Sequence, residues 1–226
     1  MSLGSVRARM AAACARAGRP ASSVTLVGVT KGHDADEVRR RLVDAGLLDL
    51  GENRVQEWRD KASALPAEVR WHFVGSLQRN KVKYLADGGV ALVHSLNSAR
   101  LADAMQAQGE RRAHPFRALI EVNVAGEDAK QGVAPERVAP LLDHCRPLDH
   151  VEVVGLMAMA PFSDDPEDAR PTFRRLRELA DLHGLPERSM GMSGDFEVAI
   201  EEGATLIRVG TALFEPDARD EEGATT

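Results

Sequence analysis

The sequence predicts an α/β fold, a single (β/α)8 barrel of the TIM type with one extra helix at its N-terminus. Roughly eight short apolar or β-branched runs alternate with segments of helical periodicity, as strands and helices do in such a barrel. No low-complexity linker divides the 226 residues, and a barrel of this type can be built from about 200. The GxGxxG fingerprint of an open doubly wound sheet, the competing architecture, is absent.

The first element is expected to be a covering helix. Residues 1–20 are rich in Ala and Arg and lack acidic residues, a composition also found in organelle transit peptides. However, Val6, Met10, Ala13 and Ala17 recur at helical spacing, and no apolar run is long enough for a signal sequence or a membrane span. We therefore interpret this segment as an amphipathic helix that packs on the barrel.

The remaining elements alternate along one predicted domain, residues 1–226, with an ordered core of about 5–216 and an acidic tail at 217–226. Helical segments such as 34–46 and 170–184 end at a glycine, which suits a helix C-terminus. The expected strands share apolar or β-branched residues and lie within residues 24–31, 47–53, 70–76, 91–97, 117–124, 151–159, 188–195 and 205–214.

Charge and cysteine content restrict the function. The formal net charge of -6 opposes a phosphate backbone, so nucleic acid is not an expected main partner, and no membrane partner is expected. Cys14 and Cys145 are too few for a disulfide framework, and neither lies in a CxxC motif or a His-rich cluster. We expect a protein of the reducing cytoplasm without a structural metal.

In a TIM barrel the chemistry lies at the carboxyl ends of the strands. Strand alternation places Lys31 on the face of Val29, and Arg208 on the face of Gly210. First and last strands are neighbours in a closed barrel, so Lys31 and Arg208 are expected at the same mouth. The other residues expected there are small or polar, with one methionine: Asn53, Ser76, Ser95, Asn123, Met159, Ser193, Gly210 and Thr211.

Each charged residue also has a simpler interpretation. A lysine after a strand is more often solvated, its stem lying along the surface. An arginine in the apolar run "TLIRVGTALF" needs a partner, either a ligand or a structural carboxylate such as Glu52 or Glu121.

Two adjacent loops indicate a phosphate site. Small residues in "SMGMSGD" allow backbone amides to approach a ligand, and the N-terminus of the helix expected in "GDFEVAIEEG" would favour an anion. Gly210 and Thr211 close the next strand in the same way, although a single Gly/Ser loop is more often only a turn. A lysine, a phosphate cradle and an arginine at one mouth suggest pyridoxal 5'-phosphate (PLP), held as a lysine imine.

Several motifs together resemble the pyridoxal phosphate homeostasis protein family, also called the YggS/PROSC family, which is related to the N-terminal barrel of alanine racemase. The likeness covers about residues 5–216. It implies an alanine racemase-like barrel (PLP fold type III) and a PLP-binding protein that serves intracellular PLP homeostasis and transfer. The motifs that carry it are "VTLVGVTK", "GENRVQE", "WHFVGSLQRNK", "GLMAM" and "SMGMSGDFEVAIEEGATLIRVGTALF".

Carried over residue by residue, the resemblance implies a covalent cofactor on Lys31 and an Arg208 that faces the pyridine nitrogen. Gly32 and His33 stand where a hydroxyl residue and a basic residue are expected after the lysine. The phosphate would be held by Ser193, Gly210 and Thr211, and the pocket would be lined by Asn53, His72 and Met157.

Simpler interpretations of the last three residues stay open. His72 suits a packed strand histidine, Asn53 suits the N-cap of the next helix, and Met157 suits the core. The basic segments 39–41, 54–61 and 78–83 are interpreted as solvated helix faces.

Amino-acid racemisation is the alternative function, and a lysine Schiff-base aldolase is a third. Racemisation needs a second acid/base group opposite the lysine. In alanine racemases, the resemblance implies, this is a tyrosine from an added C-terminal domain, for which the 226-residue sequence has no room; its single tyrosine, Tyr84, lies in a helix-like segment. We expect no racemase turnover, a monomer, and apo forms of PLP-dependent enzymes as acceptors.

Overall fold

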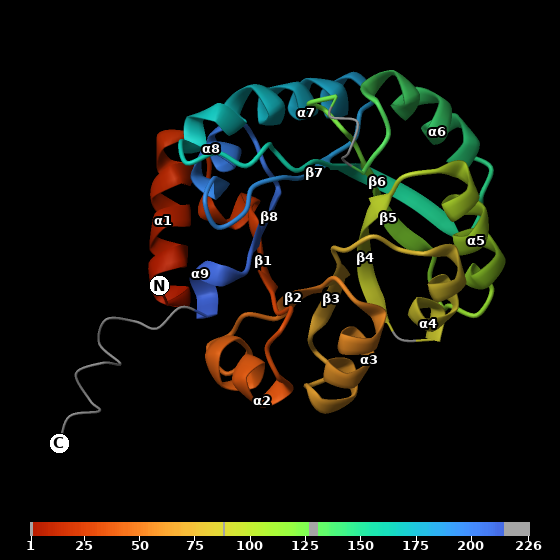
Figure 1. The fold of residues 1–226 in the computed structure, drawn as a ribbon, viewed down its shortest axis with the longest axis horizontal. Helices are drawn as coiled ribbons and strands as arrows, with labels where there is room; N and C mark the ends of the chain where they lie inside the picture. The colour runs from red at the N-terminus through yellow and green to blue at the C-terminus, as the bar shows by residue number, and fades with distance from the viewer. Residues whose placement is uncertain (1, 88, 127–130, 215–226) are drawn as a thin grey trace.

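The computed structural model describes residues 2–87, 89–126 and 131–214, and these form a closed barrel of eight parallel strands. Each strand pairs with its neighbours in chain order, and β1 pairs with β8 to close the ring. Figure 1 shows the strands encircled by helices, so the predicted fold class is confirmed. The strands are β1 (Thr25–Val29), β2 (Asp49–Glu52), β3 (Arg70–Phe73), β4 (Val90–Leu96), β5 (Phe116–Glu121), β6 (Val151–Met157), β7 (Glu187–Ser189) and β8 (Leu206–Val209).

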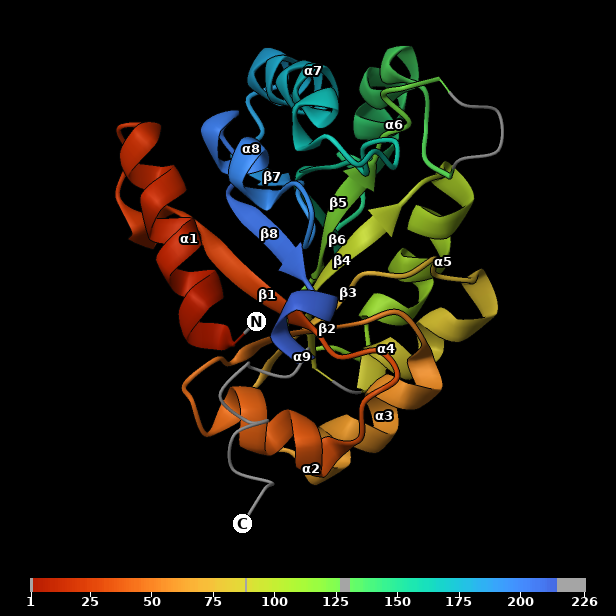
Figure 2. The same ribbon diagram turned by 60° about the vertical axis from the view of Figure 1, so that its left-hand side comes forward.

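The predicted N-terminal helix is α1 (Leu3–Arg16), whose Ser2 N-cap accepts a hydrogen bond from the Ser5 amide. Its buried residues face the barrel, and the helix lies beside α8 in both views (Figures 1 and 2). The other helices are α2 (Ala35–Val38), α3 (Val55–Ala64), α4 (Val82–Asp87), α5 (Ala99–Gly109), α6 (Val138–Cys145), α7 (Arg170–Leu182), α8 (Phe196–Glu201) and α9 (Thr211–Phe214).

Two predicted strands are shorter than expected. The chain leaves β7 after Ser189, so residues 190–195 form a loop, and α9 takes up the apolar end of the last predicted strand. Gly191 explains the first change: its φ is +94°, and a Cβ there would lie 2.6 Å from the Cβ of Ala199. The acidic tail at 217–226 lies outside the described residues.

Alternation along the strands sorts side chains between the inside of the barrel and the helices. Val27 and Leu206 lie in a small interior cluster, whereas their chain neighbours Leu26 and Ile207 join the larger core under the helices. Arg208 follows Leu206 by two residues, so its side chain also points into the barrel.

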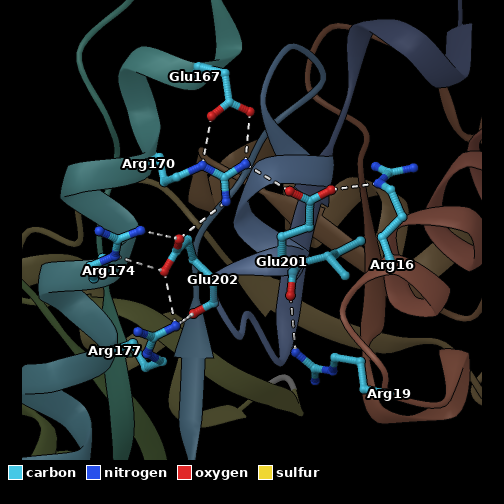
Figure 3. Close-up of polar contacts among 9 residues, drawn as sticks. Arg16, Arg19, Glu167, Arg170, Arg174, Arg177, Glu201 and Glu202 are labelled. Atoms are coloured by element: carbon cyan, nitrogen blue, oxygen red, sulfur yellow. Dashed lines mark hydrogen bonds and ion pairs between the residues drawn. The ribbon is translucent and has the colours of Figure 1, made fainter.

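A network of ion pairs fixes α8 against its two neighbouring helices (Figure 3). Glu201 accepts from Arg16 of α1 and from Arg170 of α7. Burial favours the neutral form of the Glu202 carboxyl, but the arginines around it outweigh this and lower its pKa. The side chains that donate to Glu202, which is 4% exposed, all come from α7: Arg170, Arg174 and Arg177.

Both cysteines, Cys14 and Cys145, are buried free thiols. Among the described residues, none of the helices combines the length and the apolar character that a membrane crossing requires. Within the same ranges, no cluster of three or more His, Cys, Asp or Glu side chains is suited to bind a metal ion.

Candidate functional site

A cavity of about 740 Å³ opens at the carboxyl ends of the strands. It brings together most of the residues that the sequence places at the mouth, and it includes Glu121 and Asp195 as well. Four expected residues do not line it: His72, Ser95, Asn123 and Met157. The predicted residues in its lining are Lys31, Asn53, Ser76, Met159, Ser193, Arg208, Gly210 and Thr211.

Lys31 lies in the turn after β1, and the residues on both sides of it are fixed. Thr30 is buried, and its carbonyl accepts a 2.6 Å hydrogen bond from Nζ of Lys61. The amide of Gly32 donates to Oε2 of Glu57 at 3.2 Å. The Lys31 side chain itself is exposed and lines the cavity. The backbone is therefore anchored while the amine stays accessible.

The anchor behind Lys31 is a buried ion pair that the sequence analysis missed. Glu52 is fully buried and pairs with Lys61, which is 6% exposed; Glu52 also accepts from the Thr30 hydroxyl at 2.6 Å. The interpretation of residues 54–61 as a solvated helix face is wrong for Lys61. Lys61 lies in α3, nine residues after Glu52, and its side chain returns to the end of β2, which the charge pattern alone does not reveal.

The two unusual residues after the lysine have clear structural positions. Gly32 has a φ of +79°, a left-handed conformation that glycine adopts without strain. His33 stacks on the ring of Phe214 in α9, with ring centroids 3.6 Å apart, and its Nδ1 lies 2.9 Å from Oε2 of Glu37. The loop beside Lys31 is thereby held against α9, the short helix that follows the last strand.

Arg208 lies inside the barrel, 5% exposed, with one edge in the cavity lining. Its Nη1 donates to the Ser189 hydroxyl, and its Nη2 donates to the carbonyl of Ala158 at 3.1 Å. Burial lowers the pKa of Arg208 to about 10, although Asp195 and Glu121 act in the opposite direction. The guanidinium therefore remains a cation at neutral pH.

The carboxylates considered as partners of Arg208 make no ion pair with it in the described part of the chain. Glu52 is engaged by Lys61, and Glu121 affects Arg208 only through its electrostatic field. Because the partners of the guanidinium are a hydroxyl and a carbonyl, its charge is not neutralised by direct contact. This charge is available to a ligand in the cavity.

The two predicted phosphate-binding loops meet in the cavity lining. The hydroxyl of Ser193 accepts a long, 3.4 Å hydrogen bond from the amide of Ala212, which links the loop at 190–195 to the start of α9. A Cβ on Gly210 would lie 3.3 Å from the carbonyl oxygen of Val29, so little space remains there for a side chain. Small residues on both loops leave the backbone accessible.

The helix after the first loop was predicted to favour an anion at its N-terminus, but its contribution is small. This helix, α8, has only six residues, and Asp195 stands at its N-cap position. Asp195 accepts a 2.6 Å hydrogen bond from the Met192 amide, and burial raises the pKa of its carboxyl. Since a carboxyl already lies at the helix N-terminus, the loop amides and hydroxyls are the better candidates for anion binding.

Two acceptors in the cavity lack a partner among the described residues. Oε2 of Glu121 and Oδ1 of Asn53 are both buried and unpaired. Burial also raises the pKa of Glu121. The sequence signal for Glu121 is an acidic residue within the apolar strand "RALIEVNV". From the sequence alone it is expected only as a partner of Arg208. Asn53 is not a helix N-cap, because Arg54 occupies that position.

His72 and Met157 lie below the cavity rather than in its wall. Met157, 2% exposed, belongs to the interior cluster, and Met159 lines the cavity two residues later. His72, 5% exposed, packs between Oδ1 of Asp49 at 3.2 Å and Nε2 of His94 at 3.0 Å. Both side chains are buried below the level of the cavity. The simpler interpretation, in which each residue packs in the protein interior, therefore fits both.

Asp49→Asn is expected to destabilise the fold in a pH-dependent way. Burial alone would raise the pKa of Asp49, but hydrogen bonds from His72 and Arg70 outweigh it and lower the pKa from 3.8 to about 2. The carboxylate thus contributes about 2 kcal/mol that is present above about pH 4 and lost as pH falls towards 2.

Urea unfolding of wild type and Asp49→Asn between pH 2 and 7 measures this contribution. Asp103→Asn is the matched control, because its carboxylate forms an exposed pair with His144. A wild-type advantage that stays constant over the whole pH range would contradict the prediction.

Comparison with known proteins places the chain in a family. Residues 1–217 match the model of the alanine racemase N-terminal domain. The chain is 48% identical over 219 residues to the pyridoxal phosphate homeostasis protein of Aquifex aeolicus, with 94% of this chain and 95% of that protein covered. It is 46% identical over 215 residues to the protein of the same name from Deinococcus radiodurans, with 95% and 100% covered.

Solved structures agree with this relation. PipY of Synechococcus elongatus PCC7942, solved with PLP bound, is 32% identical, with a TM-score of 0.77 and 93% of this chain and 100% of that chain covered. An alanine racemase of Clostridium difficile is only 13% identical, with a TM-score of 0.71 over 98% of this chain and 59% of that one, and shares the fold alone. The chain therefore belongs to the pyridoxal phosphate homeostasis protein family.

Proposed function

We propose that this chain binds PLP covalently through Lys31 and holds and transfers it for PLP homeostasis, without racemase turnover of its own. The observation that carries the proposal is the convergence of Lys31, Arg208 and two small-residue loops on one cavity. The PLP bound in PipY, a structure 32% identical to this chain, supports the choice of ligand.

The residues present fit such a group. A cavity of about 740 Å³ lies in the range of small-molecule sites. The unpaired oxygens of Glu121 and Asn53 are positioned to accept hydrogen bonds from a ligand that carries donors. Arg208, a cation at neutral pH, supplies positive charge that favours an anionic ligand.

Each residue has a distinct proposed role. Lys31 would hold PLP through a C=N bond between its amine nitrogen and the aldehyde carbon, the aldehyde oxygen leaving as water. Ser193, Gly210 and Thr211 bind the phosphate with hydroxyls and backbone amides, and Arg208 donates a hydrogen bond to the ring nitrogen. When bound, PLP supplies an electrophilic carbon and an electron-withdrawing ring. Because Arg208 cannot accept the ring-nitrogen proton, it keeps that nitrogen unprotonated and the ring a weaker electron sink.

Borohydride reduction tests the covalent site. The absorbance spectrum of the protein with PLP is recorded before and after reduction, and peptide mass mapping then locates the adduct. We expect a stable adduct on Lys31. An adduct on one of the other four lysines of the sequence, Lys61, Lys81, Lys83 or Lys130, would overturn the assignment.

We expect no racemisation at an enzymatic rate. Racemisation needs a second acid/base group within hydrogen-bond reach of the reacting carbon. Tyr84, the single tyrosine, lies in α4 under the cations of Arg59, Lys81 and Lys83 and is not part of the cavity lining. The test is α-proton exchange in deuterium oxide with L-alanine and other amino acids. Turnover of about 1 to 10³ per second would restore the racemase alternative.

The chain is proposed to act in the cytoplasm as a monomer, since one chain supplies every residue named for the site, and to pass PLP to apo forms of PLP-dependent enzymes. Light scattering measures the mass in solution. Activation of an apo-enzyme by the loaded protein, in the presence of a scavenger of free PLP, tests transfer.

A further inference from the structure

A continuous chain of buried polar side chains crosses the inside of the barrel below the cavity. It starts at Arg208 on β8, whose Nη1 donates to Ser189 on β7. Oγ of Ser189 lies 2.9 Å from Nδ1 of His94 on β4, and Nε2 of His94 lies 3.0 Å from Nδ1 of His72 on β3. Nε2 of His72 lies 3.2 Å from Oδ1 of Asp49 on β2.

The chemistry of the arginine end fixes the direction of the first hydrogen bond. A guanidinium only donates, so Ser189 accepts from Arg208 and its own proton is free to donate to Nδ1 of His94. With both imidazoles neutral and His94 assigned as its Nε2–H tautomer, His94 donates to Nδ1 of His72, and Nε2 of His72 donates to Asp49. Each group passes one hydrogen bond onward from the cation to the anion.

Burial isolates this chain of side chains from solvent. Ser189 and His94 are fully buried, so no water competes for their polar atoms. Burial, reinforced by Arg208, lowers the pKa of His94 well below its usual value, so this imidazole is neutral. The carbonyl of Ala158 holds the other terminal nitrogen of Arg208. Both terminal nitrogens of the guanidinium are thus fixed from within the barrel.

We propose that Ser189 and His94 are positioning residues: through this chain they fix the guanidinium of Arg208 so that it presents a donor to the ring nitrogen of the ligand in the cavity. The inference rests on the proposed function but goes beyond it, since neither residue touches the cavity. It predicts that the preference for a ring nitrogen depends on a hydroxyl and an imidazole buried behind the arginine.

The test compares PLP with its 1-deaza analogue, in which a C–H group replaces the ring nitrogen. Wild-type protein is expected to bind PLP at least about tenfold more tightly, because the analogue leaves a donor of Arg208 unpaired. Ser189→Ala removes the acceptor of Nη1, so Arg208 can turn away and the preference is expected to fall to about twofold or less. Ser189→Thr keeps the hydroxyl and is expected to retain the preference.

Ser95→Ala is the matched control, because Ser95 is 1% exposed, lies next to His94 on β4, and its Oγ has no partner among the described residues. It is expected to keep the wild-type preference. His94→Leu is a second, independent disruption if Ser189→Ala folds poorly, as judged by circular dichroism. It is expected to lower the preference in the same way.

The outcomes separate the inference from the proposed function. An equal loss of affinity for both ligands, or an unchanged preference in Ser189→Ala and His94→Leu, would overturn the positioning role and leave the Lys31 assignment standing. Absence of a reducible adduct on Lys31 in the wild-type protein would instead overturn the proposed function. A preference lost in both variants and kept in Ser95→Ala would support the inference.

Discussion

Lys31→Ala is expected to abolish the imine absorbance of the protein with PLP and to remove the borohydride-stable adduct. Lys31 is the lysine in the cavity lining, and the described residues place no other lysine there. Without its amine no C=N bond forms at this position, and only the non-covalent contacts of Arg208 and the phosphate loops remain. Absorbance titration with PLP, followed by mass spectrometry after reduction, measures the loss.

Lys83→Ala is the control for this change. Lys83 is exposed on α4, close to the ring of Tyr84 and outside the cavity lining. The variant removes one amine from the protein without changing the site, so its spectrum is expected to match that of wild type. An imine band that persists in Lys31→Ala and disappears in Lys83→Ala would move the covalent site to the surface.

Pyridoxal, which lacks the phosphate, is expected to bind at least about 30-fold more weakly than PLP. Loss of the dianion removes the hydrogen bonds that the amides and hydroxyls of the two loops would make to it, and a hydrogen bond to a charged group contributes about 1.5 to 3 kcal/mol. A single such bond of about 2 kcal/mol already corresponds to about 30-fold in affinity. Equilibrium dialysis with the two ligands measures the ratio.

Thr211→Val sharpens this test, since it replaces one hydroxyl in the cavity lining by a methyl group of similar size. The variant is expected to reduce the ratio of the affinities for PLP and for pyridoxal. In the wild-type protein, inorganic phosphate is expected to compete with PLP. Equal affinity for the two ligands would remove the phosphate cradle from the site.

The strand pattern was predictable because a parallel barrel buries each strand on both faces, which produces conspicuous apolar runs. Every predicted run overlaps a strand, although β7 shares only two residues with its run. The ends were less predictable. β7 is short because Gly191 turns the chain towards α8, and the end of the last run becomes α9. Both changes depend on packing between elements that local periodicity does not report.

The sequence predicts which residues of the site lie at the strand ends. It does not predict which side chains pair with one another. Lys31 and Arg208 line one cavity because β1 and β8 are neighbours, a consequence of closing the barrel. The Glu52–Lys61 pair and the contact between His72 and His94 join residues of different elements. No spacing in the sequence marks these pairs, because only the folded barrel brings them together.

The ion pairs around α8 join parts of the chain that leave the ribosome far apart in time. Arg16 of α1 pairs with Glu201, 185 residues later, and Arg9 pairs with Glu197, 188 residues later. A nascent chain that has emerged only as far as β7 already carries Lys31 but has neither Arg208 nor either of the two phosphate loops. A growing chain therefore exposes its reactive amine long before it can select a ligand, and selectivity begins only when the last strand has closed the ring and α8 has docked on α1.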